Sequence, residues 1–495
     1  MKGTNMKTTM LIITLLAAAL CYADTHIPAG AVSGVWDSTG SPYMIDGDIN
    51  VPTDDSLIIA PGCSLIFTGH YSLTVDSMAL FKAIGTVDDS IVFTAQDTVL
   101  TDSTGGHHGI RSSSYELINI SFCIIEYGNA LEDSSSWYSS CGGGLFLFFG
   151  SNTEITNTVV KHSRAKSFGG GICVEGLGII FKNNCLIDNK SLWGGGLYVG
   201  DADIFNCVFA YNTADSGGAV ASGSSASTRR FSNCTFLDNI ALNAKSVFTA
   251  MDNTQDIFLN CIFYSLAEDT LYEIVVSCGL IAMSYSFIDT NSCFNRVTSV
   301  FGPGIIFESS ILFDSLGSIG QLSVGSPCID AGNDSVLYTY WDWDSVFYAP
   351  DHDIEGNPRP LGAGYDIGAY EYVPTGIGEA GKGFKPLAYE ISAYPNPFNS
   401  AVRISLDAPV GAGLRPARVE IFDIAGRRVA QLPEDGTVGE ALVASRYGEK
   451  REGTSPSPTA REITWMPNAS LGSGVYLVRA KVGDGEITKR VVYLK

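Results

Sequence analysis

A four-residue motif, asparagine followed by cysteine and two β-forming residues, recurs along the middle of the chain and constrains the fold more than any other feature. Its copies follow at intervals of 22, 27 and 27 residues. Consecutive glycines interleave with it, at 142–144, 169–171, 194–196 and 217–218. A fixed period of this length indicates a solenoid. The motif and a related earlier copy occur at Asn157–Val160, Asn184–Ile187, Asn206–Phe209, Asn233–Phe236 and Asn260–Phe263.

The segments between these motifs are short runs of β-forming residues without helical periodicity, so each repeat is a coil of strands. Stacked coils place equivalent strands about 4.8 Å apart in long parallel sheets. Glycine and asparagine tolerate the left-handed backbone that each corner repeats. We therefore predict an all-β chain: a right-handed parallel β-helix over residues 24–325, with about a dozen coils, and then a small C-terminal β-sandwich.

The motif cysteines are predicted to form a buried ladder, because side chains two apart in a strand share a face. The inward pairs are then Cys185 with Ile187, Cys207 with Phe209, Cys234 with Phe236, and Cys261 with Phe263. Stacked thiols point the same way rather than at each other, which favours reduced structural cysteines. Disulfides remain the alternative, and the spacing lacks the close cysteine pairs of metal sites.

The N-terminus is typical of a cleaved secretory signal. Lys2 and Lys7 precede an apolar run and a small-residue end, so residues 1–23 are the predicted signal peptide and Asp24 the first mature residue. Lipid attachment at Cys21 is the alternative, although Leu20 precedes it where a small residue is expected. The run is too short to span a bilayer, and we expect no transmembrane segment in the mature chain.

Charge is unevenly distributed. Residues 24–372 carry 12 Lys and Arg against 39 Asp and Glu, whereas residues 373–495 carry 16 against 13. A body this acidic repels phosphate backbones, so we expect no nucleic-acid partner.

Two further motifs lie in the repeat region. Phe209–Asn212 and Phe236–Asn239 alternate with Gly217–Val220. Together they resemble the FxxN and GGA[ILV] repeats of polymorphic outer-membrane proteins, which are β-helical surface adhesins. The resemblance covers a stretch of about one hundred residues; the triple glycines depart from the family pattern and the family's C-terminal barrel is absent. It implies an adhesive surface protein.

The segment that follows the repeats has its own motifs, Ser326–Asn333, Gly356–Arg359 and Asp366–Glu371. They are similar to the closing segment of bacterial surface β-helix proteins that carry a separate anchor domain. The resemblance implies that residues 326–372 cap the exposed end of the solenoid, which terminal coils require.

Beyond a linker at 373–390, residues 391–495 resemble a type IX secretion C-terminal sorting domain. The resemblance rests on an ordered series of motifs that includes Val419–Arg428 and Ser473–Tyr476. It implies export across the outer membrane by the type IX secretion machinery, with the tail removed as the protein is attached to the surface. The sorting motif comprises Tyr394, Pro395, Asn396, Pro397, Phe398, Asn399, Gly426, Gly474 and Lys495.

Parallel β-helices also host polysaccharide lyases and glycoside hydrolases, so an enzyme is the alternative class. Glycosidase chemistry needs two carboxylates within about 5 to 9.5 Å, which here means outward positions on neighbouring coils. Alternation instead predicts outward residues that are mostly not acidic, and we therefore predict no catalytic residue. They are Phe146, Phe148, Cys173, Glu175, Tyr198, Gly200, Ala221, Leu186, Asp188, Val208, Ala210, Thr235, Leu237, Ile262 and Tyr264.

Two other groups have a catalytic interpretation that we consider weaker. Lys161, Arg164 and Lys166 cluster at a coil corner, where a solvated turn is the simpler interpretation. His107 and His108 resemble the His-Gly element of polygalacturonases, but the accompanying Asn-Thr-Asp element is missing, and we interpret them as part of a coil.

Phe168 and Trp193 precede the glycines on consecutive coils and are our candidates for glycan binding. If they point outward they form an aromatic platform of the kind that stacks on sugars; inward packing is the more common alternative. Asp342, Asp344, Asp351 and Asp353 are the candidates for a calcium site, against the alternative of a plain acidic loop, and no other cofactor is expected. The sequence thus predicts a secreted cell-surface protein that binds glycans or other surface ligands without catalysis.

Overall fold

The computed structural model describes the β-helical part of the chain almost continuously and the C-terminal part in pieces. The described residues are 24–374, apart from 101, 132–136, 149–152, 177–178, 223–227, 243–245, 251–253, 266–272, 277–278, 290–298, 315–317 and 341–342, followed by 390–394, 401–407, 418–423, 427–431, 442–443, 461–467, 471–482, 485–493 and 495.

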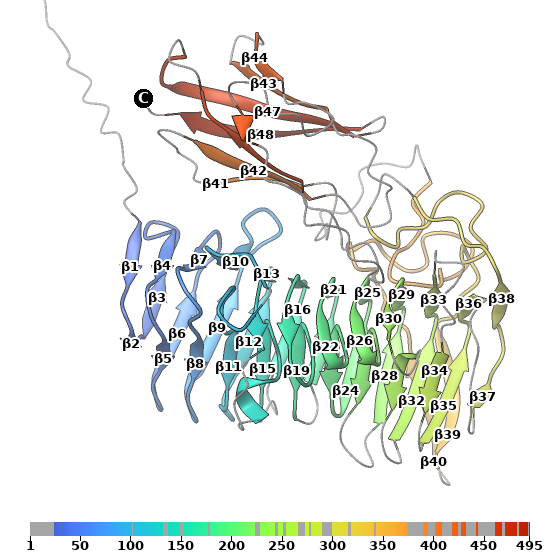
Figure 1. The fold of residues 1–495 in the computed structure, drawn as a ribbon. Coiled ribbons are helices and arrows are strands. Elements are labelled where there is room, and N and C mark those ends of the chain that lie inside the picture. The colour runs from blue at the N-terminus through green and yellow to red at the C-terminus, as the bar shows by residue number, and fades with distance from the viewer. Residues whose placement is uncertain are drawn as a thin grey trace, which may run out of the picture.

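Within these residues the chain winds into a parallel β-helix (Figure 1), as predicted. Three long parallel sheets run its length, and consecutive strands of the chain belong to different sheets. The twelve strands of the first sheet match the number of coils that the repeat period predicts.

Sheet A contains β1 (Thr25–Ile27), β4 (Tyr43–Ile45), β7 (Ser64–Phe67), β10 (Ile91–Ala95), β13 (Cys123–Glu126), β17 (Val159–Lys161), β21 (Cys185–Ile187), β25 (Val208–Ala210), β29 (Thr235–Leu237), β33 (Ile262–Tyr264), β36 (Phe287–Asp289) and β38 (Ile306–Glu308). Sheet B contains β2 (Gly30–Ala31), β5 (Ile49–Val51), β8 (Leu73–Val75), β11 (Ile110–Ser112), β15 (Leu145–Leu147), β19 (Ile172–Val174), β23 (Leu197–Val199), β27 (Val220–Ser222), β31 (Ser246–Ala250) and β34 (Glu273–Val276).

Sheet C contains β3 (Gly34–Trp36), β6 (Ser56–Ile59), β9 (Leu80–Ile84), β12 (Ile118–Ser121), β16 (Thr153–Thr156), β20 (Ile179–Lys182), β24 (Ala202–Phe205), β28 (Thr228–Ser232), β32 (Thr254–Leu259), β35 (Gly279–Ser284) and β37 (Ser299–Phe301). A shorter corner sheet contains β14 (Asn129–Ala130), β18 (Arg164–Ala165), β22 (Lys190–Trp193), β26 (Thr213–Ser216) and β30 (Ile240–Ala241).

The interior is a continuous apolar core in which like residues stack from coil to coil. On sheet A, Phe209, Phe236 and Phe263 occupy paired positions on consecutive strands. Their ring centroids are 5.0 and 4.6 Å apart, with planes within 5° of parallel. Repetition of one side chain at one position therefore continues the core along the axis.

Glycine and asparagine hold two of the corners, as predicted, whereas the corner after sheet A has other residues with positive φ, among them His162, Asp188 and Tyr211. Gly169 and Gly194, the first glycines of two triplets, have φ of 61° and 67°. Asn206, Asn233 and Asn260 have φ between 50° and 53°. These are left-handed conformations, which these two residue types adopt at least cost.

The cysteine ladder is confirmed for three of its four predicted members and wrong for the fourth. Cys207, Cys234 and Cys261 are buried in the core. Cys185 and Ile187 instead lie on the outer face of sheet A, and Leu186 points inward in their place. The reason is the corner: Asn183, with φ of 58°, takes the left-handed position, so this coil begins one residue earlier than the Asn-Cys motif indicates. All nine described cysteines are buried and form no disulfide.

A buried ion pair interrupts the apolar interior. Arg229 on β28 faces Asp256 on β32, with Nε–Oδ1 and Nη2–Oδ2 distances of 2.6 and 3.1 Å. Both side chains are inaccessible to solvent. Pairing on adjacent coils satisfies two charges that would otherwise be costly to bury.

The segment from Ile311 to Tyr372, called the clasp below, packs in its described residues on the outer faces of the coils, including Ile306 of sheet A's last strand. Ile319, Ile354, Ala369 and Tyr370 pack on the outer residues of sheet A, among them Cys185. Its antiparallel hairpin of β39 (Ser335–Tyr340) and β40 (Trp343–Tyr348) packs through Phe347 on Ile257 and Leu259 of sheet C. Residues 326–372, expected to cap the helix, thus cover outer faces of its later coils.

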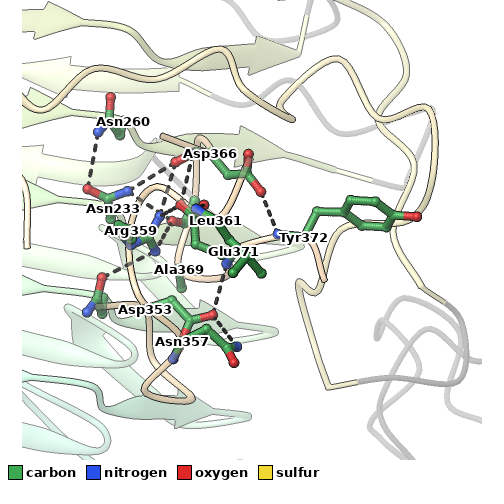
Figure 2. Close-up of polar contacts among 12 residues, drawn as sticks. Asn233, Asn260, Asp353, Asn357, Arg359, Leu361, Asp366, Ala369, Glu371 and Tyr372 are labelled. Atoms are coloured by element: carbon green, nitrogen blue, oxygen red, sulfur yellow. Dashed lines mark hydrogen bonds and ion pairs between the residues drawn. The ribbon is translucent and has the colours of Figure 1, made fainter. Parts of the chain in front are cut away.

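Corner asparagines fasten the clasp to the helix (Figure 2). Asn206 donates from Nδ2 to the carbonyl oxygen of His352 at 2.7 Å. Asn233, labelled in Figure 2, donates to the carbonyl oxygen of Asp366 at 3.1 Å. Asn260 donates to the carbonyl of Asn333 at 2.7 Å and accepts from its amide at 2.9 Å. The motif asparagines therefore have two roles: their backbone forms the corner of the coil, and their side chains attach the clasp.

The C-terminal part is a small antiparallel sandwich, as predicted. One sheet contains β41 (Glu390–Tyr394), β42 (Val402–Asp407), β46 (Arg461–Trp465) and β45 (Leu442–Val443). The other contains β44 (Arg428–Gln431), β43 (Arg418–Asp423), β47 (Gly474–Val482) and β48 (Gly485–Tyr493). Their inner residues, including Ile404, Trp465 and Tyr476, form a core of their own.

Candidate functional site

The outer face of sheet B carries a group of aromatic and small side chains. Strand pairing places Arg111, Phe146, Cys173, Tyr198 and Ala221 opposite one another on five consecutive coils. The last four belong to a buried cluster that is separate from the core of the solenoid. They point outward, as alternation along these strands predicts.

Phe168 and Trp193 lie beside this cluster on adjacent coils. An isolated parallel β-bridge pairs the two residues, and each is followed by a glycine with positive φ. Both side chains are half-buried and pack against the outward cluster, so the inward alternative is wrong. The ring of Phe168 is 4.5 Å from that of Tyr198, centroid to centroid. We call Tyr138, Phe146, Phe148, Phe168, Trp193 and Tyr198 the aromatic face.

Tyr138 was not among the predicted site residues. It lies in the short 3-10 helix Trp137–Ser139 and is 46% exposed. Its ring meets those of Phe146 and Phe148 edge-on, with centroid distances of 5.5 and 4.9 Å. The Trp-Tyr pair inside a serine-rich insert is the sequence signal that could have identified it.

Arg111 holds the insert against the sheet. Its Nε donates to the carbonyl of His108 at 2.7 Å, and its Nη1 donates to the carbonyls of Tyr138 and Cys141. The guanidinium carbon is also 5.7 Å from the ring centroid of Phe146. This cation therefore fixes the loop that positions Tyr138.

Glu175 supplies an ionisable group next to the aromatic side chains. Its amide donates to the carbonyl of Leu147 at 2.8 Å, which places Glu175 beside Phe148 on the neighbouring coil. Partial burial raises the pKa of its carboxyl group, and burial together with the charge of Glu175 raises the pKa of Tyr198. Half-exposed aromatic rings next to a few polar groups are typical of sites that bind small polar ligands.

The calcium candidates do not come together as a described site. Asp342 lies outside the described residues, and Asp344 is within β40. Asp351 is exposed and 3.0 Å from Nδ1 of His352. Asp353 is buried, and its two oxygens accept four hydrogen bonds, from the amides of Glu355, Asn357 and Glu371 and from Asn357 Nδ2. Among the described residues no group of three His, Cys, Asp or Glu side chains could hold a metal ion.

The clasp contains a group of carboxylates, Asp353, Asp366 and Glu371, around Arg359 (Figure 2). Arg359 Nη1 lies 2.6 Å from Glu371 Oε1, and both side chains are inaccessible to solvent. Burial and the charge of Glu371 raise the pKa of Asp366 to about 7. A perturbed carboxyl group of this kind is a catalytic signal in a cleft, but here the acids bind backbone amides of the clasp and hold its shape.

The basic and histidine candidates also have structural partners. Lys161 lies 3.3 Å from Glu126, and Arg164 donates to the carbonyl of Leu100 at 2.7 Å. His107 is fully buried, with Nε2 3.0 Å from the carbonyl of Glu126 and Nδ1 accepting from the amide of Gly109. His108 Nε2 is 3.1 Å from the carbonyl of Ser139. These contacts match the coil interpretation.

The structure describes three residues of the sorting motif. Tyr394 ends β41 and pairs with Arg403 of β42, and Gly474 begins β47. The amide of Lys495 donates to the hydroxyl of Ser473 at 2.7 Å. Pro395, Asn396, Pro397, Phe398, Asn399 and Gly426 lie outside the described residues.

Comparison of the chain with protein-family models, with curated proteins and with solved structures finds no match. In the part of the chain that the structure describes, no helix has the length and apolarity needed to cross a membrane.

Proposed function

We propose that this chain is an exported surface protein whose β-helix binds glycans without cleaving them. The aromatic face is the observation that carries the proposal. Exposed apolar surface of this kind marks binding sites in soluble proteins, and aromatic rings stack on the apolar faces of sugars. Phe168, Trp193 and Tyr138 are partly exposed on one side of the helix, next to the carboxyl group of Glu175.

The partners of the acidic residues elsewhere on the coils favour binding over catalysis. Glu126 accepts from Thr94 and pairs with Lys161, and Asp203 makes a two-point ion pair with Arg230 at 2.5 and 2.8 Å. A catalytic carboxylate pair needs two acids that face a shared substrate position. The described acids at these positions face cations and hydroxyl groups instead.

Retention on immobilised polysaccharides tests the proposal. Trp193→Ala, in the chain from Asp24 to Lys495, removes a stacking surface and is expected to weaken retention about tenfold. Tyr138→Ala is the second variant, because its exposed side chain contributes little to folding. Leu192→Ala is the matched control, since Leu192 is 42% exposed and adjacent in sequence but outside the aromatic face.

New polysaccharide chain ends, which cleavage would produce, are measured in the same samples. Retention without new reducing or unsaturated ends supports a binding module. New ends would contradict the non-catalytic part of the proposal, and equal retention of all three variants would contradict the placement of the site.

We further propose that residues 391–495 are a type IX sorting domain that delivers the protein to the cell surface. The two-sheet sandwich and the position of Gly474 at the start of a strand agree with that role. A fluorescent reporter with a signal peptide, fused to residues 391–495, is expected to reach the surface of a bacterium that has type IX secretion. The same fusion in a strain without that system is the control; periplasmic retention in both strains would reject the proposal.

A further inference from the structure

We infer that the aromatic face takes an uncharged sugar chain rather than a polyanionic one, and that Glu175 enforces this choice. The inference rests on the proposed glycan-binding function and adds the class of ligand. It follows from the charge of the body, the position of the charged groups at the face and the arrangement of the rings along the coils.

The body that carries the face is strongly acidic. Residues 24–372 have 39 Asp and Glu against 12 Lys and Arg. The summed field of such a surface lowers the local concentration of anions and slows their approach. Uronate and sulfate chains are therefore disfavoured over neutral chains before any contact is made.

At the face itself, the carboxylate of Glu175 acts in the same direction. Arg111 is a cation, but it is only 9% exposed and its Nε and Nη1 groups donate to three backbone carbonyls, so these donors do not face a ligand. Glu175 is half-buried beside Phe148 and Tyr198. A ligand carboxylate in contact with Phe148 would face the carboxylate of Glu175, whereas a sugar hydroxyl would donate to it.

The rings are arranged for a chain rather than a single sugar. Phe168 and Trp193 are paired on adjacent coils, and the exposed ring of Tyr138 lies against Phe146 and Phe148 of the coil before them. Phe146 and Tyr198 are buried beneath these rings. Adjacent coils are about 4.8 Å apart. The face therefore extends along the solenoid axis over several coils, in the direction that an extended oligosaccharide would follow.

The exposed lysines nearest to these rings in the sequence are Lys166 and Lys190. Lys190 belongs to the corner strand β22, and Lys166 directly follows the corner strand β18. They are the groups that would attract an acidic chain if the inference were wrong. A variant of Lys190 is therefore part of the test.

The experiment compares neutral and acidic polysaccharides under one set of conditions. The chain from Asp24 to Lys495 is measured on laminarin and galactomannan and on alginate and polygalacturonate, from about 0.01 to about 0.15 M salt. Over this range the Debye length falls from about 30 to about 8 Å. We expect retention on a neutral polymer to be independent of salt, and retention on the acidic polymers to be at least about tenfold weaker at low salt and to rise as repulsion is screened.

Glu175→Gln is expected to improve acidic relative to neutral binding about two- to fivefold, the effect of one partly exposed charge. Glu154→Gln is the matched control: it makes the same change of net charge, at an exposed position on the outer face of sheet C. An equal effect of the two variants would overturn the role of Glu175.

The remaining outcomes distinguish failure of the inference from failure of the proposed glycan-binding function. The inference would be overturned if acidic polymers bound as tightly as neutral ones and this binding were lost in Lys190→Ala. If binding were still weakened by Trp193→Ala, the proposed glycan-binding function would stand. Absence of retention on all four polymers would instead remove the proposed function, and the inference with it.

Discussion

Asparagine has two distinct uses in this chain, according to the backbone conformation that it holds. Asn206, Asn233 and Asn260 sit at corners with positive φ and direct their amides outward. A second series inside the coils, Asn189, Asn212 and Asn239, is fully buried, and each member donates from Nδ2 to a carbonyl of the preceding coil, at 2.8 to 2.9 Å. The buried series therefore joins each coil to a strand of sheet A on the preceding coil.

His107 gives the N-terminal coils a defined dependence on pH. It is stacked on Phe67 at 4.7 Å, and its Nδ1 accepts a backbone hydrogen bond, so the neutral ring fits and the protonated ring does not. Burial lowers the pKa of His107 to about 3, from an ordinary value of 6.5. Between these values the unfolded chain binds the additional proton, so stability falls as pH drops below about 6.5, with a slope approaching about 1.4 kcal/mol per pH unit.

Chemical denaturation at pH 7 and pH 4.5 measures this effect. His107→Gln is expected to lose stability at pH 7 but to show a smaller further loss at pH 4.5 than the unsubstituted chain. His26→Gln, at an exposed histidine, is the control. An identical pH dependence in the His107 variant would show that the histidine does not titrate on unfolding.

At the scale of elements, the sequence predicts the coil and its glycines well because each corner demands one backbone conformation. The register of a single coil is harder to predict. Asn183 or Asn184 could hold the corner, and alignment of Cys185 with the other motif cysteines selects Asn184, whereas the structure has Asn183 there. The clasp could not be placed from sequence, since its contacts join residues as far apart as Asn206 and His352. For the candidate site, the position of Phe168 and Trp193 directly before the glycines predicts that they are neighbours on adjacent coils. The position of Tyr138 could not be predicted, because it depends on a hydrogen bond from Arg111, 27 residues away in the sequence.

The corner asparagines are expected to decide how firmly the clasp is held. Asn260→Gly removes the donor and acceptor that bind Asn333 and keeps the positive φ without strain, so its effect reports the hydrogen bonds. We expect the clasp to open more easily by about 1 to 3 kcal/mol, measured as faster amide hydrogen exchange over residues 326–372. Asn157→Gly, at a corner with φ of 49°, is the matched control. Equal exchange in the two variants would mean that apolar packing alone holds the clasp.

At the scale of the whole molecule, the solenoid and the sandwich have separate cores. The stacked residues of the coils, such as Phe236, and the inner residues of the sandwich, such as Trp465, belong to different clusters among the described residues. A repeat array is stabilised by contacts between neighbouring coils, whereas the sandwich is stabilised by packing between its two sheets. The two parts should therefore respond separately to a change in either core.

Trp465→Ala tests this separation. Trp465 is 2% exposed and packs edge-on against Tyr476 at 5.4 Å, so its truncation is expected to cost the sandwich about 3 to 5 kcal/mol. Calorimetry of the chain should then show one transition moved to lower temperature and the other unchanged. Phe236→Ala should move the other transition, because its ring lies between those of Phe209 and Phe263 in the coils. A shift of both transitions by either variant would mean that the two cores unfold as one cooperative unit, so that the sandwich could not be removed without loss of stability in the β-helix.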